Sequence, residues 1–295
     1  MINNSLFDFI GNTPLVKAQN ILQKKDVSLY LKLEGNNPGG SVKDRAAFNM
    51  IRSAMDRNDI KKGDYLIEAT SGNTGIALAM IAQQFGINIE LVMPENSTKE
   101  RVQTMIAYGA KVTLTSSEIG IEGSRIYAEK QVIDKGYYML NQFANEDNWK
   151  AHYKTTGPEI WRDTNGEITH FVSAMGTTGT IMGTSTFLKE KNAAIQIVGA
   201  QPTDNSKIPG IRKWSKEFLP KIFDAKKVDT VIEVSEAEAR TMTKRLAKEE
   251  GIFAGMSSGG AVNAALKLAK TIDSGVIVAV ICDRGDRYLS SNLFE

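Results

Sequence analysis

A lysine follows a short polar turn at a point where an amine could stay uncharged. Lys43 comes after Asn-Asn-Pro-Gly-Gly-Ser-Val (36–42), which follows an apolar run and leads into a helix expected to start around Ser41 or Val42. The positive end of the helix dipole disfavours a charged ammonium there. Because an uncharged amine is the form that attacks a carbonyl carbon, this position favours Schiff-base chemistry. Most lysines are simply solvated, and on these residues alone that alternative stays open.

A second turn between a predicted strand and a predicted helix carries groups that could bind a carboxylate. Residues 69–75 read Ala-Thr-Ser-Gly-Asn-Thr-Gly, and Asn73 is expected to open the helix. Hydroxyl groups, an amide and free backbone N–H groups at a helix start are donors for an anion. An ordinary helix-capping loop would have a similar composition, so both interpretations stand.

A third turn, Gly-Thr-Thr-Gly-Thr at 176–180, has the composition of a phosphate cradle. Glycine lets the backbone approach a ligand closely, the threonines add hydroxyl donors, and the helix that follows favours an anion. The segment lacks the Gly-Lys-Ser/Thr of a nucleotide P-loop and the GxGxxG pattern of a dinucleotide site. A fourth turn, Gly-Met-Ser-Ser-Gly-Gly at 255–260, would by itself be a helix cap.

The elements that must position these turns alternate between short apolar runs and longer amphipathic segments. Strands are predicted at 27–33, 65–69, 89–93, 111–115, 171–174, 196–201 and 276–281. Helices are predicted at 73–85, 98–108, 123–135 and 237–250, the last preceded by a capping box that starts at Ser235. This alternation predicts an α/β fold of open, mostly parallel twisted sheets with helices on both faces. A polar segment at 141–150 could separate two lobes and leave a ligand-binding cleft between them.

Composition narrows the classes of function. The 295 residues include 36 basic and 34 acidic side chains, and a net charge of +2 gives no general attraction to nucleic acid or to an anionic membrane. The single cysteine, Cys282, excludes an intramolecular disulfide, and with only two histidines the chain lacks a metal-binding pattern. No apolar stretch could span a bilayer and no signal-peptide pattern is present, so a cytoplasmic protein is expected.

Taken together and in this order, the four turns resemble those of the fold-type II pyridoxal 5'-phosphate enzymes, and within them the cysteine synthases (O-acetylserine sulfhydrylases). The resemblance runs from Ile-Gly-Asn-Thr-Pro-Leu at 10–15 to Asp-Arg-Tyr-Leu-Ser at 286–290, nearly the whole chain. Segments 33–38, 208–214 and 281–288 resemble the B type of this family more than the A type. The implied fold is similar to that of the tryptophan synthase β subunit.

The resemblance implies a role for each turn. Lys43 would carry the cofactor as a Schiff base and later act as acid and base at the substrate Cα. Asn73 would hydrogen-bond the cofactor 3'-oxygen, and Ser257 would face the pyridine nitrogen. The cofactor phosphate would be bound by Gly176, Thr177, Thr178, Gly179 and Thr180. The substrate carboxylate would be held by Thr70, Ser71, Gly72, Thr74 and Gln142.

The implied reaction is a β-replacement that makes cysteine. O-Acetyl-L-serine would lose acetate to leave an α-aminoacrylate, to which sulfide adds. A neutral Ser257 hydroxyl cannot hold the pyridine nitrogen protonated as an aspartate would, which weakens the ring as an electron sink and favours elimination and replacement over transamination. Arg212, a cation expected near the cleft mouth, could bind thiosulfate and so give S-sulfocysteine; the alternative is an ordinary surface arginine.

The same resemblance implies two lobes and a set of partners. Residues 1–34 and 146–295 would form a larger lobe that binds the cofactor phosphate and the pyridine nitrogen. Residues 35–145 would form a smaller, mobile lobe with the carboxylate loop, and the cofactor lysine at its edge. A homodimer is implied, whereas the B-type features argue against serine acetyltransferase as a partner.

Several alternatives remain at this stage. Serine/threonine dehydratases and cystathionine β-synthases share the fold, and O-phosphoserine is an alternative electrophile. A cofactor-free binding protein would lack the lysine or break the phosphate loop, and neither is seen; a nucleotide kinase is disfavoured because no Walker lysine is present. Cys282 is interpreted as an inert buried thiol that the resemblance places near the cofactor ring, and His152 and His170 as structural residues.

Overall fold

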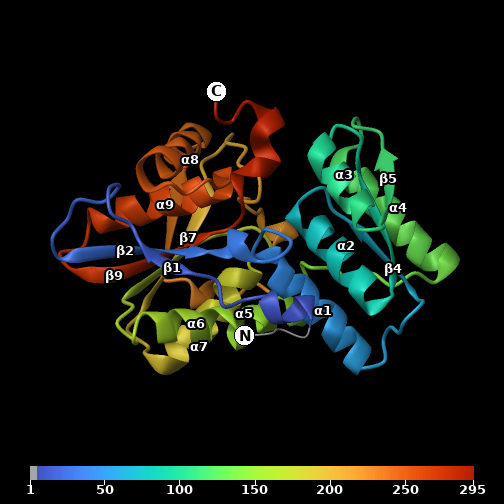
Figure 1. Ribbon diagram of the computed structural model, residues 1–295, viewed down its shortest axis with the longest axis horizontal. Helices are drawn as coiled ribbons and strands as arrows, with labels where there is room; N and C mark the ends of the chain where they lie inside the picture. The colour runs from blue at the N-terminus through green and yellow to red at the C-terminus, as the bar shows by residue number, and fades with distance from the viewer. Residues whose placement is uncertain (1–4) are drawn as a thin grey trace.

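The larger of two sheets has six strands in the order β1-β2-β9-β6-β7-β8 within residues 5–295, the part of the chain that this computed structural model describes (Figure 1). Every neighbouring pair is parallel except β1 and β2. The strands are β1 (Leu15–Lys17), β2 (Val27–Leu33), β6 (His170–Ala174), β7 (Gln196–Pro202), β8 (Thr230–Val234) and β9 (Gly275–Ile281). The strand nearest the C-terminus, β9, lies between β2 and β6.

Helices cover both faces of this sheet. One face carries α8 (Glu236–Glu250) and α9 (Met256–Ala269), and the other carries α5 (Glu146–Lys154), α6 (Thr156–Asp163) and α7 (Gly179–Lys191) (Figure 1). Successive side chains of β9 point to opposite faces. Ile277 packs in the core with α8 and α9, whereas Val278 packs in the core with α6 and α7. Burial on both faces explains why the run at 276–281 is continuously apolar.

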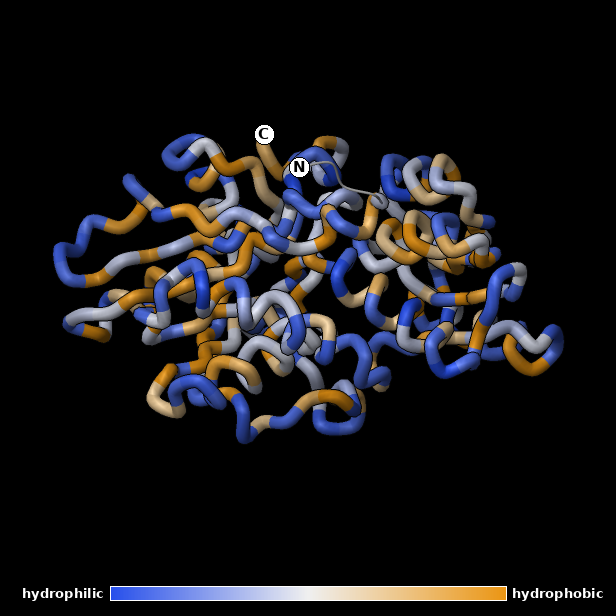
Figure 2. The backbone as a smooth tube through the Cα atoms, turned by 60° about the horizontal axis from the view of Figure 1, so that its bottom comes forward, coloured by the Kyte–Doolittle hydropathy of each residue, from blue (hydrophilic) through white to orange (hydrophobic). Residues whose placement is uncertain are grey.

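The smaller sheet consists of β3 (Tyr65–Ala69), β4 (Asn88–Pro94) and β5 (Lys111–Thr115), all parallel. Leu66 and Leu91 pack in one core with α1 (Lys43–Asp56), α2 (Asn73–Phe85) and α3 (Lys99–Ala107). Ile67 and Val92 point to the other face, where they meet α4 (Gly120–Lys135). Along the outer helices hydrophilic and hydrophobic residues alternate, as expected of helices with one buried face (Figure 2).

Short 3₁₀ turns complete the described chain. They are η1 (Leu6–Phe9), η2 (Glu34–Asn36), η3 (Lys216–Phe218), η4 (Ala225–Lys227) and η5 (Gly285–Ser291). The turn η2 leads from β2 toward the polar turn before Lys43, and η5 follows the end of β9. Both therefore lie beside strand ends that approach the candidate site.

A buried ion-pair network fastens α1 to the larger sheet. The Arg45 guanidinium donates from Nε to Glu34 Oε2 at 2.7 Å and from Nη1 to Glu159 Oε1 at 2.6 Å. Lys32 Nζ, on β2, lies 2.8 Å from Glu159 Oε2. Burial alone would raise the pKa of Glu34, but the Arg45 guanidinium holds it below its ordinary value. Because Arg45 is two residues from Lys43, this network fixes the helix that carries the candidate nucleophile.

The predicted α/β class, with mostly parallel sheets and helices on both faces, is confirmed. The strand predicted at 27–33 and the helix predicted at 73–85 have these bounds, and the capping box of α8 joins Ser235 and Glu238. Two strands, β1 and β8, were missed because β1 has only three residues and β8 exposes most of its side chains, leaving little apolar pattern. The smaller sheet lies within 35–145 and the larger sheet outside it, while the division into a fixed and a mobile lobe stays a prediction.

Candidate active site

Lys43 is the first residue of α1, and the chain just before it is joined to the end of β9. Val42 N donates to Cys282 O at 2.8 Å, and Ser41 forms an isolated bridge with Asp283. The Lys43 amine has no hydrogen-bond or ion-pair partner among residues 5–295. Burial lowers the pKa of Lys43 below its ordinary value of 10.5, although Cys282 and Asp283 oppose this effect. The structure thus favours an uncharged amine.

The predicted carboxylate receptor forms where β3 ends and α2 begins. Asn73 opens α2 as predicted, and the backbone N–H groups of Asn73 and Thr74 have no acceptor among the described residues. Thr74 Oγ1 donates to Gln142 Oε1 at 2.8 Å. Because that oxygen is occupied, the Gln142 amide presents its N–H donors for a ligand. The structure therefore brings Gln142 to the 69–75 turn, although Gln142 and Thr74 are 68 positions apart in the sequence.

The predicted phosphate cradle lies between β6 and α7. No described residue accepts a hydrogen bond from the backbone N–H groups of Gly176, Thr177 or Thr178. Thr178 has a left-handed backbone (φ 70°), and its buried hydroxyl has no partner in the described chain. A Cβ on Gly176 would lie 2.6 Å from Gly210 O, so only glycine fits there. Aligned free donors at a helix start suit a bound anion.

Ser257 lies on the first turn of α9, beside the phosphate cradle. A Cβ on Gly210 would come within 3.5 Å of the Ser257 hydroxyl, and Gly210 itself touches Gly176. Ser258 Oγ accepts from Cys282 N at 2.9 Å, which joins the start of α9 to the end of β9. The Ser257 side chain is buried and neutral, as the predicted partner of a ring nitrogen should be.

Cys282 is half-buried, whereas the sequence predicted a buried thiol. Its enclosed position raises the pKa of the thiol to about 11, although the nearby Lys43 amine opposes this effect. A thiol with a raised pKa stays protonated at neutral pH and is a poor nucleophile. The raised pKa supports the interpretation of Cys282 as an inert thiol, although its side chain is less buried than that interpretation expected.

The contacts between these turns close into a ring. The start of α1 meets the end of β9; Asp283, just after β9, accepts from Asn73 Nδ2 at 2.7 Å. Asn148 Nδ2 donates to Gln142 O at 2.7 Å and contacts Thr177 Oγ1 at 3.2 Å. The turns joined by this ring combine an amine of lowered pKa, an anion cradle with free donors and a neutral hydroxyl. These residues fit pyridoxal phosphate, which presents an aldehyde carbon, a phosphate and a ring nitrogen.

Several residues beside this ring carried no signal in the sequence. His152 was interpreted as structural, yet its Nε2 lies 3.3 Å from Thr180 Oγ1 in the cradle, and its Nδ1 lies 2.8 Å from Thr156 Oγ1. Burial lowers the pKa of His152 to about 3, so the imidazole is neutral. Its position four residues before Thr156, on a helix with a polar buried face, is the only clue that the sequence offers.

Glu68 is a second residue without a sequence signal. It is 5% exposed at the end of β3, and one carboxylate oxygen accepts from Asn141 N at 3.2 Å. Burial raises the pKa of Glu68 to about 7, although hydrogen bonds from the backbone N–H groups of Asn141, Gln142 and Leu140 oppose this effect. The carboxylate thus holds the backbone from which the Gln142 side chain reaches the carboxylate receptor.

Arg212 is exposed, and its guanidinium lies 5.3 Å from the centroid of the Trp214 ring. Trp214 Nε1 donates to Gly176 O at 2.8 Å, and Arg212 N donates to Met175 O at 2.9 Å. The Trp214 ring also meets Phe143 edge-on at 5.5 Å. Arg212 therefore lies on a loop fastened to the phosphate cradle, and its role in binding a sulfur donor stays a prediction.

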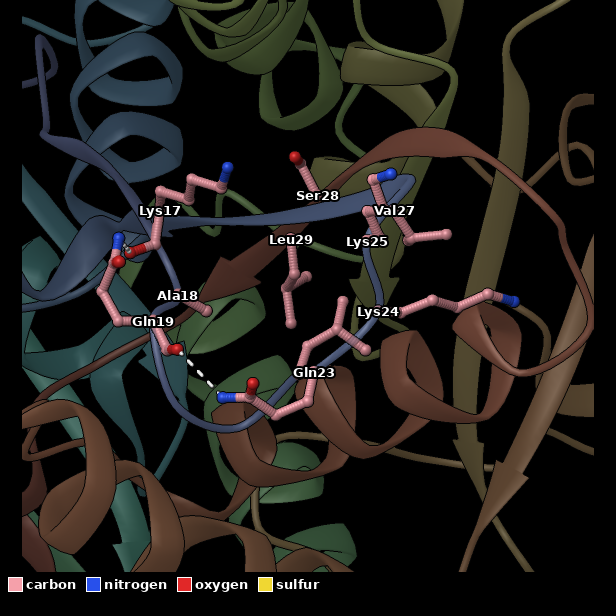
Figure 3. Close-up of a pocket in the computed structure, with 10 residues that line it drawn as sticks. Lys17, Ala18, Gln19, Gln23, Lys24, Lys25, Val27, Ser28 and Leu29 are labelled. Carbon is pink, nitrogen blue, oxygen red and sulfur yellow. Dashed lines mark hydrogen bonds between the residues drawn. The ribbon is translucent and has the colours of Figure 1, made fainter.

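A pocket of about 410 Å³ lies elsewhere, along the loop between β1 and β2 (Figure 3). Lys17, Lys24 and Lys25 are among its lining residues, and no predicted site residue is. A second pocket, of about 270 Å³, lies between α3 and η5 and is also lined by Pro38, Gly39 and Gly40. Residues 5–295 contain no cluster of three or more metal-binding side chains. None of the helices within these residues is both long and apolar enough to pass through a membrane.

Comparison with known proteins gives full-length similarities. A family model described as pyridoxal-phosphate dependent enzyme matches residues 6–283. Cysteine synthase B of Pseudomonas aeruginosa is 57% identical over 291 residues, covering 99% of this chain and 97% of that protein. Cysteine synthase B of Escherichia coli is 54% identical, covering 99% and 96%.

Solved structures agree with the fold. A cysteine synthase from Entamoeba histolytica superposes with a TM-score of 0.95 at 36% identity, covering 100% of this chain and 91% of that one. An O-ureido-L-serine synthase superposes with a TM-score of 0.94 at 36% identity, covering 100% and 96%. The assigned role of each site residue in this chain remains a prediction.

Proposed function

Because this chain belongs to the pyridoxal-phosphate dependent enzymes, we propose that it is a cysteine synthase, which converts O-acetyl-L-serine and sulfide into L-cysteine and acetate. The observation that carries this proposal is the unpartnered Lys43 amine, which shares one ring of contacts with a carboxylate receptor and a phosphate cradle. Identity of 54–57% to cysteine synthase B from two bacteria over nearly the full chain supports the choice of substrates.

Lys43, Asn73, Ser257 and the cradle residues 176–180 would hold the cofactor. Pyridoxal phosphate supplies an electron sink that stabilises negative charge at the substrate Cα. The Lys43 amine is the group placed to anchor the cofactor and, once displaced by the substrate amine, to take the proton from Cα and later return it. Its lowered pKa suits both tasks, because a general base must be unprotonated at working pH.

The carboxylate receptor would orient the substrate. Gln142 and the first turn of α2 would bind the α-carboxylate, leaving the acetoxy group on Cβ free to depart as acetate. Loss of acetate with the Cα proton, then addition of hydrosulfide to Cβ and return of that proton, balances to cysteine plus acetate. A neutral Ser257 opposite the ring nitrogen suits replacement at Cβ better than transamination.

The finer choice of sulfur donor also belongs to this proposal. Arg212 is an exposed cation on the loop that is hydrogen-bonded to Met175 and Gly176, beside the cradle. A guanidinium there suits an oxyanion such as thiosulfate, with S-sulfocysteine as the product. We further propose a cytoplasmic homodimer whose smaller lobe, 35–145, moves against the larger one.

The proposal is tested with purified protein loaded with pyridoxal phosphate. O-Acetyl-L-serine should move the visible absorption band of the cofactor to longer wavelength and release acetate, and sulfide should then restore the band and yield cysteine in equal amount. A band that ignores O-acetyl-L-serine but responds to serine or threonine would replace the proposal with a dehydratase. Restoration by homocysteine rather than sulfide would indicate a cystathionine β-synthase, a name carried by a relative at 39% identity.

A further inference from the structure

Asn148 lies between the carboxylate receptor and the phosphate cradle and contacts both. Its Nδ2 donates to Gln142 O at 2.7 Å and to Thr177 Oγ1 at 3.2 Å. The side chain is 2% exposed, so water cannot replace either contact without a rearrangement. One amide group thus touches the backbone of a predicted substrate-binding residue and the hydroxyl of a predicted phosphate-binding residue.

We propose that Asn148 is a positioning residue that sets the substrate carboxylate site and the cofactor phosphate site relative to each other. The proposal rests on the function proposed above, because it assigns one shared support to two of its subsites. Asn148 would touch neither ligand and would act through Gln142 and Thr177.

On the phosphate side, the hydrogen bond from Asn148 orients the Thr177 hydroxyl. A hydroxyl has one donor and two acceptor positions. Thr177 Oγ1 accepts from Asn148 Nδ2 at 3.2 Å and from Gly179 N at 3.3 Å. With both acceptor positions occupied, the remaining O–H of Thr177 is available only as a donor, which is the polarity that a phosphate oxygen requires.

On the substrate side, Asn148 and Glu68 both hold the backbone around Gln142 by hydrogen bonds. The Gln142 carbonyl accepts from Asn148, while the Glu68 carboxylate accepts from the neighbouring Asn141 N–H at 3.2 Å. Asn141 has a left-handed backbone (φ 53°), so the chain turns sharply between these two supports. The Gln142 side chain therefore extends toward Thr74 from a backbone that these hydrogen bonds hold in place.

The support itself is rigid. Asn148 lies in the first turn of α5, where Asn145 caps the helix by accepting from Asp147 N at 2.9 Å. Asn49 Nδ2 donates to Asp147 O at 2.6 Å, and Arg57 pairs with the Asp147 carboxylate at 2.7 Å, which ties α5 to α1. A Cβ on Gly179 would overlap Asn148 Oδ1, so the start of α7 packs directly on this amide.

The test separates the two subsites in two variants, Asn148→Asp and Asn148→Ala. Asp has nearly the same shape but lacks the N–H donor and adds a negative charge beside the cradle; Ala removes the donor without adding charge. The apoprotein's affinity is measured for pyridoxal phosphate and for pyridoxal, which lacks the phosphate. We expect the affinity for pyridoxal phosphate to fall by at least ~10-fold, because a buried hydrogen-bond donor to the cradle is lost. The affinity for pyridoxal should change by no more than ~2-fold.

Steady-state kinetics of the cofactor-loaded variants provide the second readout. The KM for O-acetyl-L-serine should rise by ~5- to 10-fold with a smaller change in kcat, because Gln142 loses its backbone support. Thr74→Val should raise KM by a similar factor without changing the preference for phosphate, because the Thr74 hydroxyl donates to Gln142 and is hydrogen-bonded to no described residue of the cradle. Asn192→Asp, an exposed change of the same chemistry, is the matched control and should alter neither quantity.

Two results would overturn the proposal. One is a rise in KM with no loss of the preference for phosphate, and the other is an equal loss of affinity for pyridoxal phosphate and for pyridoxal. If Asn148→Asp fails to fold, Asn148→Ala decides between these results. The phosphate preference is measured without turnover. A wild-type protein that binds pyridoxal phosphate but ignores O-acetyl-L-serine would therefore refute the proposed function while leaving this half of the test intact.

Discussion

Arg287 Nη1 donates a hydrogen bond to Asn73 Oδ1 at 2.6 Å, and this contact fixes the direction of the Asn73 amide. Arginine has no acceptor, so the atom that faces it must be the amide oxygen. Asn73 Nδ2 consequently points to the other side, where one of its hydrogens meets Asp283 Oδ2 at 2.7 Å and the other is free for a ligand. Asp283 is itself held by Tyr288 Oη at 2.6 Å.

Arg287→Met should therefore weaken the contact that Asn73 is predicted to make with the cofactor 3'-oxygen. We expect kcat/KM to fall by ~10-fold, the cost of about one buried hydrogen bond, and the visible band of the bound cofactor to shift. Absorbance spectra and steady-state rates measure both. Arg284→Met is the control, because Arg284 pairs with Asp286 at an exposed position. An unchanged spectrum in Arg287→Met would show that Asn73 needs no such support.

Lys43→Ala should abolish turnover while the protein stays folded. Loss of a group that serves as covalent anchor and proton carrier is expected to reduce kcat by ~10³-fold or more. Turnover of O-acetyl-L-serine and the thermal unfolding temperature are measured together. Lys270→Ala removes an exposed lysine and should retain full activity. Activity in Lys43→Ala within ~10-fold of wild type would exclude this residue as the nucleophile.

Arg45→Met should destabilise the protein far more than the loss of an exposed arginine on the same helix. The change leaves Glu34 buried without its ion-pair partner and Glu159 paired with Lys32 alone, and removing one partner of a buried ion pair typically costs ~3–5 kcal/mol of unfolding free energy. Arg52→Met breaks an exposed pair with Asp56 and should cost less than ~0.5 kcal/mol. Urea unfolding measures both, and equal losses would show that the buried network contributes little.

Glu68→Gln should change how stability depends on pH. The folded pKa of about 7 lies above the ordinary value of 4.5, so the folded state binds this proton more tightly than the unfolded state does. Stability from Glu68 is fully present below pH 4.5 and is lost as pH rises through about 7. The difference in unfolding free energy between variant and wild type should thus drift by up to ~3 kcal/mol over this window. A difference that is flat with pH would show that Glu68 titrates normally.

Arg212→Ala should separate the two sulfur donors. We expect kcat/KM for thiosulfate to fall by ~10-fold or more, because the cation that pairs with the oxyanion is lost, whereas the value for sulfide should change by less than ~2-fold. Lys213→Ala, on the same loop but paired with Asp204 and Glu233, is the control. Equal effects on both donors would make Arg212 a structural residue of the loop.

The sequence predicts the turns of the site better than the residues that support them. Lys43, Asn73 and the 176–180 cradle each follow a strand and open a helix, so local pattern and helix-terminus electrostatics suffice to find them. Asn148 and Glu68 act through contacts with residues that lie 29 and 73 positions away along the chain. Such contacts depend on how helices and strands pack in three dimensions, and no spacing rule connects these residues. The strands β1 and β8 were missed for a related reason, because short or exposed edge strands show little apolar pattern.

The position of β9 has a consequence for biosynthesis. This strand is the last of the six along the chain, yet it lies between β2 and β6. During translation the larger sheet stays split, with the edges of β2 and β6 unpaired, until the ribosome has released residue 281. The smaller sheet, made wholly from a continuous internal segment, can form earlier. We expect nascent chains stopped before β9 to protect the smaller sheet from protease, to leave the larger one open, and to depend on chaperones to cover its exposed edges.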